Sequence, residues 1–314
     1  MGVVNEFSKN IKNYINKDET RDYQNILNSI NNIGNIIFDE LEQKNRIIRK
    51  NEKYKEYKVI IQLNKLGFYS ISKENKKDTK LLKIIKIKQN EIKKLDNNIK
   101  KLKNIESKFI MKIEDYFLSD FDDNHYACLL MNNCPLDNLD YIFKESKDEF
   151  KIIQIYRIFI QIIIGLYYLK SNKINLNNIN LSNIYINDKK YIYIDGAGML
   201  LSHNKDSDSS NNDQDINFKK ILGTKKKEMF YIGCIFYELL FSKKVNEENI
   251  KQIVKEKNYK KITKYEHINQ ILEKLLCPQK ERYLFSEFFS SDTYFDILKK
   301  ILLYEIQEGN LNCK

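Results

Sequence analysis

The change of hydrophobic pattern along the chain constrains the fold most. From Tyr57, the short apolar runs YKVIIQL, FYSIS and KLLKIIKIK alternate with the turn-rich segments NKLG and KENKKDTK, which predicts strands of an antiparallel sheet. A helical stretch follows at about Glu91–Ile105, and then come two more strand candidates, FIMKIEDYFL and YACLLM. After Cys134 the pattern is mainly helical, with helices expected over Leu136–Phe143, Phe150–Lys170 and Phe230–Phe241. The order predicts an α+β fold with a small antiparallel sheet and one helix, followed by a larger helical part.

This pattern divides the chain into an N-terminal helical extension at 1–52, a sheet lobe at 53–131, a helical lobe at 132–308 and a tail at 309–314. Within the helical lobe, the polar, low-complexity insert at 202–215 predicts a mobile loop. The extension places four isoleucines on one helix face: Ile26, Ile30, Ile33 and Ile37. That face fits packing on the chain's own domain and docking to a partner equally well.

The chain has few signals for secretion or membrane insertion. Its first residues, MGVVNEFSKN, have no apolar core segment, so we expect no secretory signal. The longest apolar run, Ile158–Leu169, is about a dozen residues and contains Gln161, which predicts a buried helix and no transmembrane segment. Five scattered cysteines indicate reduced thiols, and therefore a cytoplasmic or nuclear protein that is not secreted.

The net charge of +11 is concentrated in lysines between Lys50 and Lys112. A solvated face that keeps the sheet lobe soluble explains such a run. The same lysines could also form a patch for RNA, a membrane surface or another acidic partner. Both interpretations stay open, and a nucleic-acid partner would show binding that weakens steeply with salt.

Residues 174–198, INLNNINLSNIYINDKKYIYIDGAG, carry the strongest motif. They resemble the catalytic loop H-R-D-x-x-x-x-N and the D-F-G turn of eukaryotic protein kinases. Asn178 stands at the position of the catalytic base, and Asn177 stands at that of the neighbouring Arg. Asn183 and Asp195 stand at the two magnesium ligands. The resemblance implies a two-lobed kinase-like fold over about Tyr57 to Leu303, with an amide where a carboxylate accepts the substrate's proton.

The glycine-rich loop of the family, L-G-x-G-x-x-G-x-V, resembles Leu63–Ile71. Its flanking apolar positions are kept as Leu63 and Ile71, which the resemblance implies contact the nucleotide. Its three glycine positions hold Asn64, Leu66 and Tyr69. Because glycine lets backbone N–H groups close over phosphates, these side chains argue against a tight phosphate cradle.

Further family positions follow in the expected order. Lys83 resembles the lysine that binds the α- and β-phosphates, and its usual glutamate partner is replaced by Asn98. The run YACLLMNNC resembles the last strand and the hinge, with Leu130 as the gatekeeper and Met131–Asn133 as hinge backbone. The A-P-E segment of the peptide-docking shelf is missing, although Arg282, the residue that would pair with its glutamate, is kept.

These departures favour a pseudokinase, a kinase-like scaffold or regulator with a protein partner. The resemblance implies ATP and Mg²⁺ as ligands, and the altered motifs predict that their binding is weak or lost. The first alternative is a divergent active protein kinase of the Ser/Thr type that uses Lys83, Asn183 and Asp195. The second is a basic module that binds RNA or another acidic surface through the lysine-rich region.

Overall fold

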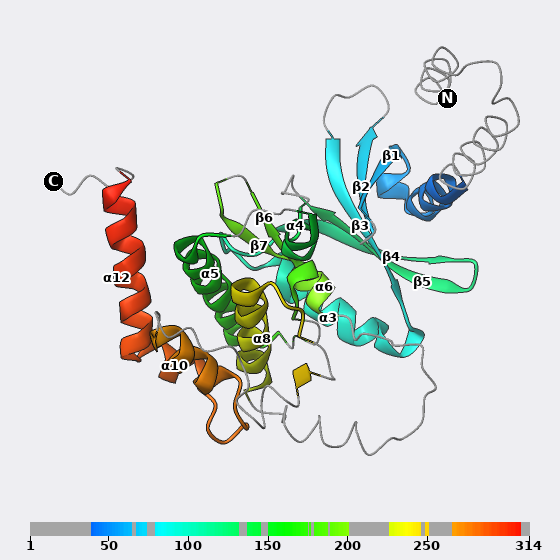
Figure 1. The fold of residues 1–314 in the computed structure, drawn as a ribbon. Helices are drawn as coiled ribbons and strands as arrows, with labels where there is room; N and C mark the ends of the chain where they lie inside the picture. The colour runs from blue at the N-terminus through cyan, green and yellow to red at the C-terminus, as the bar shows by residue number, and fades with distance from the viewer. Residues whose placement is uncertain are drawn as a thin grey trace, which may run out of the picture. The chain divides into compact units, whose positions relative to one another are not determined.

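A five-stranded sheet forms the first part of the chain, in the strand order β1-β2-β3-β5-β4. Its strands are β1 (Tyr57–Asn64), β2 (Phe68–Lys73), β3 (Thr79–Ile87), β4 (Ile113–Phe121) and β5 (Asn124–Met131). The 3₁₀ turn η2 (Glu52–Tyr54) precedes β1. The computed structural model (Figure 1) describes residues 39–64, 67–73, 79–131, 137–145, 150–174, 176, 179–187, 189–200, 226–245, 249–250 and 266–308.

Two compact units make up the chain. The first comprises Met1–Ile92 and Glu114–Asn133, and the second comprises Lys93–Ile113 and Cys134–Lys314. The 3₁₀ turn η3 (Gln89–Glu91) leads into helix α3 (Ile92–Lys103), which therefore lies in the second unit from Lys93 on. The lobe boundaries expected at 53–131 and 132–308 stay predictions.

The end of the N-terminal extension packs on the sheet. A helix covers residues 39–49 and buries Ile47 and Ile48 in a cluster with side chains of all five strands. Asn45 Oδ1 accepts a hydrogen bond of 2.7 Å from Val59 N, and Ser119 Oγ donates one of 3.1 Å to the Ile47 carbonyl. This part of the extension therefore belongs to the first unit, whereas the predicted helix face from Ile26 to Ile37 lies outside the described residues.

Helix α5 (Ile152–Ser171) is the centre of the second unit. It contacts α8 (Lys227–Phe241), α12 (Asp292–Gln307) and β7, and α5 and α8 run side by side in Figure 1. The other elements of the unit are α4 (Leu139–Glu145), η4 (Leu181–Asn183), β6 (Ile184–Ile186), β7 (Ile192–Ile194), α6 (Gly196–Leu200), α10 (Glu266–Leu275) and α11 (Phe285–Phe289).

The apolar run that the sequence assigned to a buried helix is the core of α5. By length and composition α5 could cross a membrane, and it is the one such helix in the described part of the chain. However, 56% of its most apolar window is buried inside the protein. Its buried residues include Ile158, Phe159 and Leu166, whose side chains are inaccessible to solvent. This burial is what the central helix of a packed unit shows.

Candidate functional site

The β6–β7 hairpin places the two predicted metal ligands opposite each other. Ile184 pairs with Ile194 in the antiparallel ladder, so Asn183 and Asp195 are the next pair along the two strands. The Asp195 N–H donates a 2.9 Å hydrogen bond to the Asn183 carbonyl and extends the ladder by one step. The alternating isoleucines of this hairpin are buried, which fixes the register. The sequence therefore positions both residues through the core of the second unit.

Asp195 is fully buried and caps the helix that follows it. Its Oδ1 accepts a 2.9 Å hydrogen bond from Gly198 N, and its carbonyl accepts one of 3.1 Å from Met199 N. The surroundings of Gly198 leave no room for a side chain. A Cβ at this position would overlap Asn183 Oδ1 and Asp195 Oδ2, which both lie beside it. The second glycine of D-G-A-G thus permits the close approach of the two oxygens.

This donor set fits a divalent cation of the hard type. Mg²⁺ prefers carboxylate and carbonyl oxygens and is commonly held by one or two protein ligands together with phosphate oxygens and water. Asn183 and Asp195 supply one amide oxygen and one carboxylate oxygen on adjacent sides of Gly198. Among the described residues, no group of three or more His, Cys, Asp or Glu side chains could hold a metal ion. The pair could hold Mg²⁺ only in company with other ligands.

In the first unit, Lys83 lies over an aromatic ring. Lys83 on β3 pairs with Phe68 on β2, so both side chains project from the same face of the sheet. The Lys83 ammonium lies 4.7 Å from the centroid of the Phe68 ring, within cation–π range. Both residues are buried, with Phe68 completely inaccessible to solvent. Phe68 was not among the predicted site residues, although its place just after Gly67 in the loop pattern was a signal for it.

Two of the predicted nucleotide-binding residues lie on the face of the sheet opposite Lys83. Ile71 and Leu130 belong to the cluster that packs beneath the helix at 39–49, on the face opposite Lys83. Because Leu130 pairs with Leu82, the residues of β5 that share the face of Lys83 are Leu129 and Met131. Side chains alternate between the two faces of a strand, so an error of one residue reverses the face. Met131, predicted as hinge backbone, shares the face of Lys83.

The turn before β2 is tied to β3. Gly67 has φ +82°, and a Cβ there would lie 2.7 Å from the Ile84 carbonyl oxygen. The Gly67 carbonyl in turn accepts a 3.0 Å hydrogen bond from Ile84 N. Gly67 is thus needed for the close approach of the turn to β3. Leu63, at the end of β1, is half-buried.

Several predicted positions cannot be placed. Asn133 of the hinge, together with Asn177 and Asn178 of the catalytic loop, lies outside the described residues, as does the insert at 202–215. Asn98, at the position of the helix glutamate, is described and half-buried on α3.

Arg282 is held by backbone carbonyls and a ring. It is fully buried, and its guanidinium donates a 2.7 Å hydrogen bond to the Cys277 carbonyl and one of 3.3 Å to the Lys226 carbonyl. The guanidinium carbon lies 4.6 Å from the centroid of the Phe230 ring. Burial lowers the pKa of Arg282 from its ordinary value. These contacts hold the buried guanidinium through backbone carbonyls and an aromatic ring.

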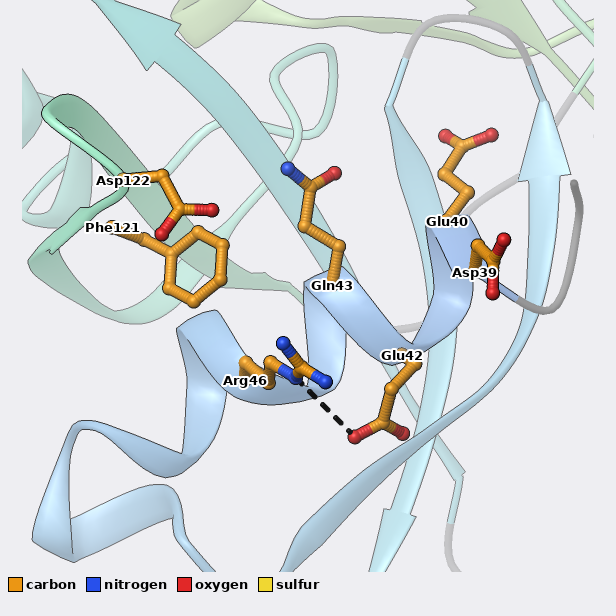
Figure 2. A pocket seen from close by; sticks show the side chains of 7 residues that line it. All are labelled: Asp39, Glu40, Glu42, Gln43, Arg46, Phe121 and Asp122. Atoms are coloured by element: carbon orange, nitrogen blue, oxygen red, sulfur yellow. Dashed lines mark ion pairs between the residues drawn. The ribbon is translucent and has the colours of Figure 1, made fainter.

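A cavity of about 410 Å³ lies between the helix at 39–49 and the β4–β5 turn (Figure 2). Its lining comprises Asp39, Glu40, Glu42, Gln43, Arg46, Phe121 and Asp122. Arg46 is oriented by Glu42, at 3.8 Å between side-chain nitrogen and oxygen. The four carboxylates would repel phosphate groups, and the helix covers the sheet face opposite Lys83. The cavity is therefore no candidate for nucleotide binding.

Comparisons with known proteins agree on the fold. The model of the family "protein tyrosine and serine/threonine kinase" matches residues 63–221, about half of the chain. The solved structures that match include the Neurospora crassa PAN3 pseudokinase, at a TM-score of 0.54 and 16% sequence identity. That alignment covers 77% of this chain and 59% of the PAN3 chain, so this chain spans less than two thirds of it. No curated protein matches the chain. The kinase-like, degenerate fold expected from the sequence, with its sheet part and helical part, is confirmed.

Proposed function

Because the chain belongs to the protein tyrosine and serine/threonine kinase family, we propose that it is a pseudokinase that acts as a scaffold or regulator. The amide at position 178 carries this proposal, because the family places its catalytic carboxylate there. A carboxylate at that position accepts the proton of the substrate hydroxyl, and an amide has no basic site of comparable strength. Loss of general-base help alone costs about 10²–10⁴-fold in rate.

The positions around Lys83 and Asp195 support the proposal. In protein kinases, catalysis depends on positioning and charge stabilisation, which require a lysine directed at phosphates. Here the Lys83 ammonium lies against the Phe68 ring, and Asp195 Oδ1 accepts the hydrogen bond of Gly198 N. Both groups therefore have partners within their own units of the protein. Together with the replaced glycines at 64, 66 and 69, these contacts favour weak nucleotide binding.

We further propose that ATP and Mg²⁺ bind weakly; the candidate residues are Lys83 and Met131 in the first unit, and Asn183 and Asp195 in the second. When bound, Mg²⁺ supplies charge neutralisation at the phosphates. Lys83 would orient phosphate oxygens, while Asn183 and Asp195 would each offer one oxygen to the metal. Lys83, Asn183 and Asp195 favour the second candidate, a divergent active kinase, since these family residues are present and buried.

A turnover assay with Asn178 variants separates the two candidates. Purified protein is incubated with radiolabelled ATP, Mg²⁺ and a mixture of protein substrates, and transfer to substrate and to the chain itself is measured. The pseudokinase proposal expects no transfer above the no-enzyme background in the natural chain, and transfer that appears in Asn178→Asp alone would show that the amide is what removes it. Transfer that requires Mg²⁺ and disappears in Asp195→Ala would overturn the proposal and favour the active kinase.

The scaffold role implies a protein partner, which we place in the cytoplasm or nucleus. Cys128, Cys234 and Cys277 are free thiols, which suits a reducing compartment. Cross-linking of the full chain in its native cells, followed by identification of the linked proteins, tests this part. Recovery of secreted proteins alone would contradict it.

A further inference from the structure

Helix α3 has two chemically distinct faces. Leu95, Ile99 and Leu102 form the buried face. The opposite face is exposed and carries lysine and asparagine side chains: Lys93, Lys94, Asn97, Lys100, Lys101 and Asn104, the last just beyond the helix. The helix contains one acidic residue, Asp96, which pairs with Lys100 at 2.6 Å. The exposed face of α3 is thus strongly positive.

Helix stability explains only half of these lysines. Cations are favourable near the C-terminal end of a helix, where Lys100, Lys101 and Lys103 lie in the last turn. The first turn of α3 begins at Ile92 and contains Lys93 and Lys94 but no acidic residue, and Glu91 directly precedes the helix. Cations there interact unfavourably with the helix dipole, at a cost in helix stability. Within the described part of the chain neither lysine forms an ion pair that would offset this cost, so their placement points to a ligand.

The lysine pairs repeat along the helix. Lys93 and Lys100, like Lys94 and Lys101, are seven residues apart, which is about two turns or about 10.5 Å along the axis. Lys101 Nζ also donates a 3.1 Å hydrogen bond to the Lys173 carbonyl just beyond α5. Because Lys173 is itself exposed, the positive row continues from α3 to the end of α5.

We propose that this row binds the phosphodiester backbone of a nucleic acid without reading its bases. Repeated lysine pairs along a straight helix suit the repeated charges of one strand, and asparagine amides can donate to phosphate oxygens. The exposed face of α3 has no arginine or aromatic side chain to hydrogen-bond or stack on bases, so binding is independent of sequence. A membrane surface is a poorer fit, because the apolar face of α3 is already buried in the protein and cannot insert.

The salt dependence of RNA binding tests the proposal. The full chain is titrated into a fluorescein-labelled RNA 20-mer of mixed sequence, and Kd is measured by anisotropy at 50 and 200 mM KCl. Four neutralised phosphates predict a log–log slope of about −2.8, so affinity falls by about 50-fold over this range. The variant K93Q/K94Q/K100Q/K101Q is expected to lose RNA binding. The variant K93Q/K94Q, which removes half of the row, is expected to keep a slope of about −1.4.

A control at other exposed lysines separates a site from overall charge. K189Q/K243Q removes two charges elsewhere on the second unit and is expected to bind RNA as the natural chain does. Thermal unfolding of every variant verifies folding, and the two double variants K93Q/K94Q and K100Q/K101Q carry the test if the quadruple variant unfolds. Equal loss in K189Q/K243Q, no loss in the α3 variants, or tighter binding to phosphatidylserine vesicles than to RNA would each overturn the proposal.

Discussion

The ammonium of Lys83 lies 4.7 Å from the centroid of the Phe68 ring, and the two side chains project from the same face of the sheet. The ring faces the cation with its electron-rich surface and competes with any phosphate for it. Replacing Phe68 with Leu keeps an apolar side chain but removes this competitor, which is worth about 1 kcal/mol. We therefore expect Phe68→Leu to bind Mg²⁺–ATP about fivefold more tightly than the natural chain. The ATP-induced shift of the thermal midpoint measures this.

Lys83→Met provides the control for that prediction. Lys83→Met removes the cation whether residue 68 is Phe or Leu. The gain in Mg²⁺–ATP affinity from Phe68→Leu should therefore vanish in the double variant. A gain that persists in the double variant would show that the ring acts on something other than Lys83.

The position of Phe68 also shows where sequence reasoning reached its limit. The strands at 57–64, 68–73 and 79–87 were predicted closely, because hydrophobic alternation and turn residues are local signals. The face on which each side chain projects depends on register, and the registers of β2 and β5 on β3 come from pairing between strands that are distant in sequence. Ile71 and Leu130 were therefore assigned to the nucleotide by a motif that carries no information on register.

The positions of Asn183 and Asp195 beside each other follow from signals that are local in the sequence. Each lies directly beside a short isoleucine-tyrosine-isoleucine strand, and the family motif fixes the spacing between them. The role of Gly198 was not predicted, since it depends on the close approach of two oxygens that are distant in sequence. The contacts of Arg282 were not predicted either. Its acceptors are backbone carbonyls, which every residue has, so no residue type in the sequence indicates them.

Gly198→Ala should destabilise the end of the β6–β7 hairpin, where Asn183 and Asp195 lie opposite each other. The added methyl group would overlap Asn183 Oδ1 and Asp195 Oδ2, and overpacking of this kind costs about 1–3 kcal/mol. We expect a lower free energy of unfolding in urea and loss of any Mg²⁺-dependent stabilisation. Ala197→Gly, one residue earlier, is the matched control and should retain both properties apart from a small helix-propensity loss. Unchanged unfolding of Gly198→Ala would contradict the close packing.

Arg282 should be sensitive even to a conservative change. Arg282→Lys retains the positive charge but cannot donate to the Cys277 and Lys226 carbonyls while also stacking on Phe230. A buried carbonyl without its donor costs about 1–3 kcal/mol, so we expect Arg282→Lys to lower the free energy of unfolding by about 2 kcal/mol. Chemical denaturation measures this loss. Lys280→Arg, at a nearby exposed position, should be neutral, and an equally neutral Arg282→Lys would refute the anchoring role.

His267 should lower the stability of the protein in mild acid. Burial, with a further contribution from Lys300, lowers the pKa of His267 below its ordinary 6.5, while Asp296 opposes the shift. The Tyr156 hydroxyl also contacts His267 Nε2, joining α5 to α10. Below pH 6.5 the unfolded chain binds more protons at this site than the folded chain does, so its contribution to stability is complete above pH 6.5 and declines as pH falls toward the folded pKa. We expect the midpoint of urea unfolding to decrease from pH 7.5 to pH 5.5, and we expect His267→Gln, which does not titrate, to show a smaller decrease. The same decrease in both proteins would assign the effect to other groups, because the difference between them isolates the imidazole.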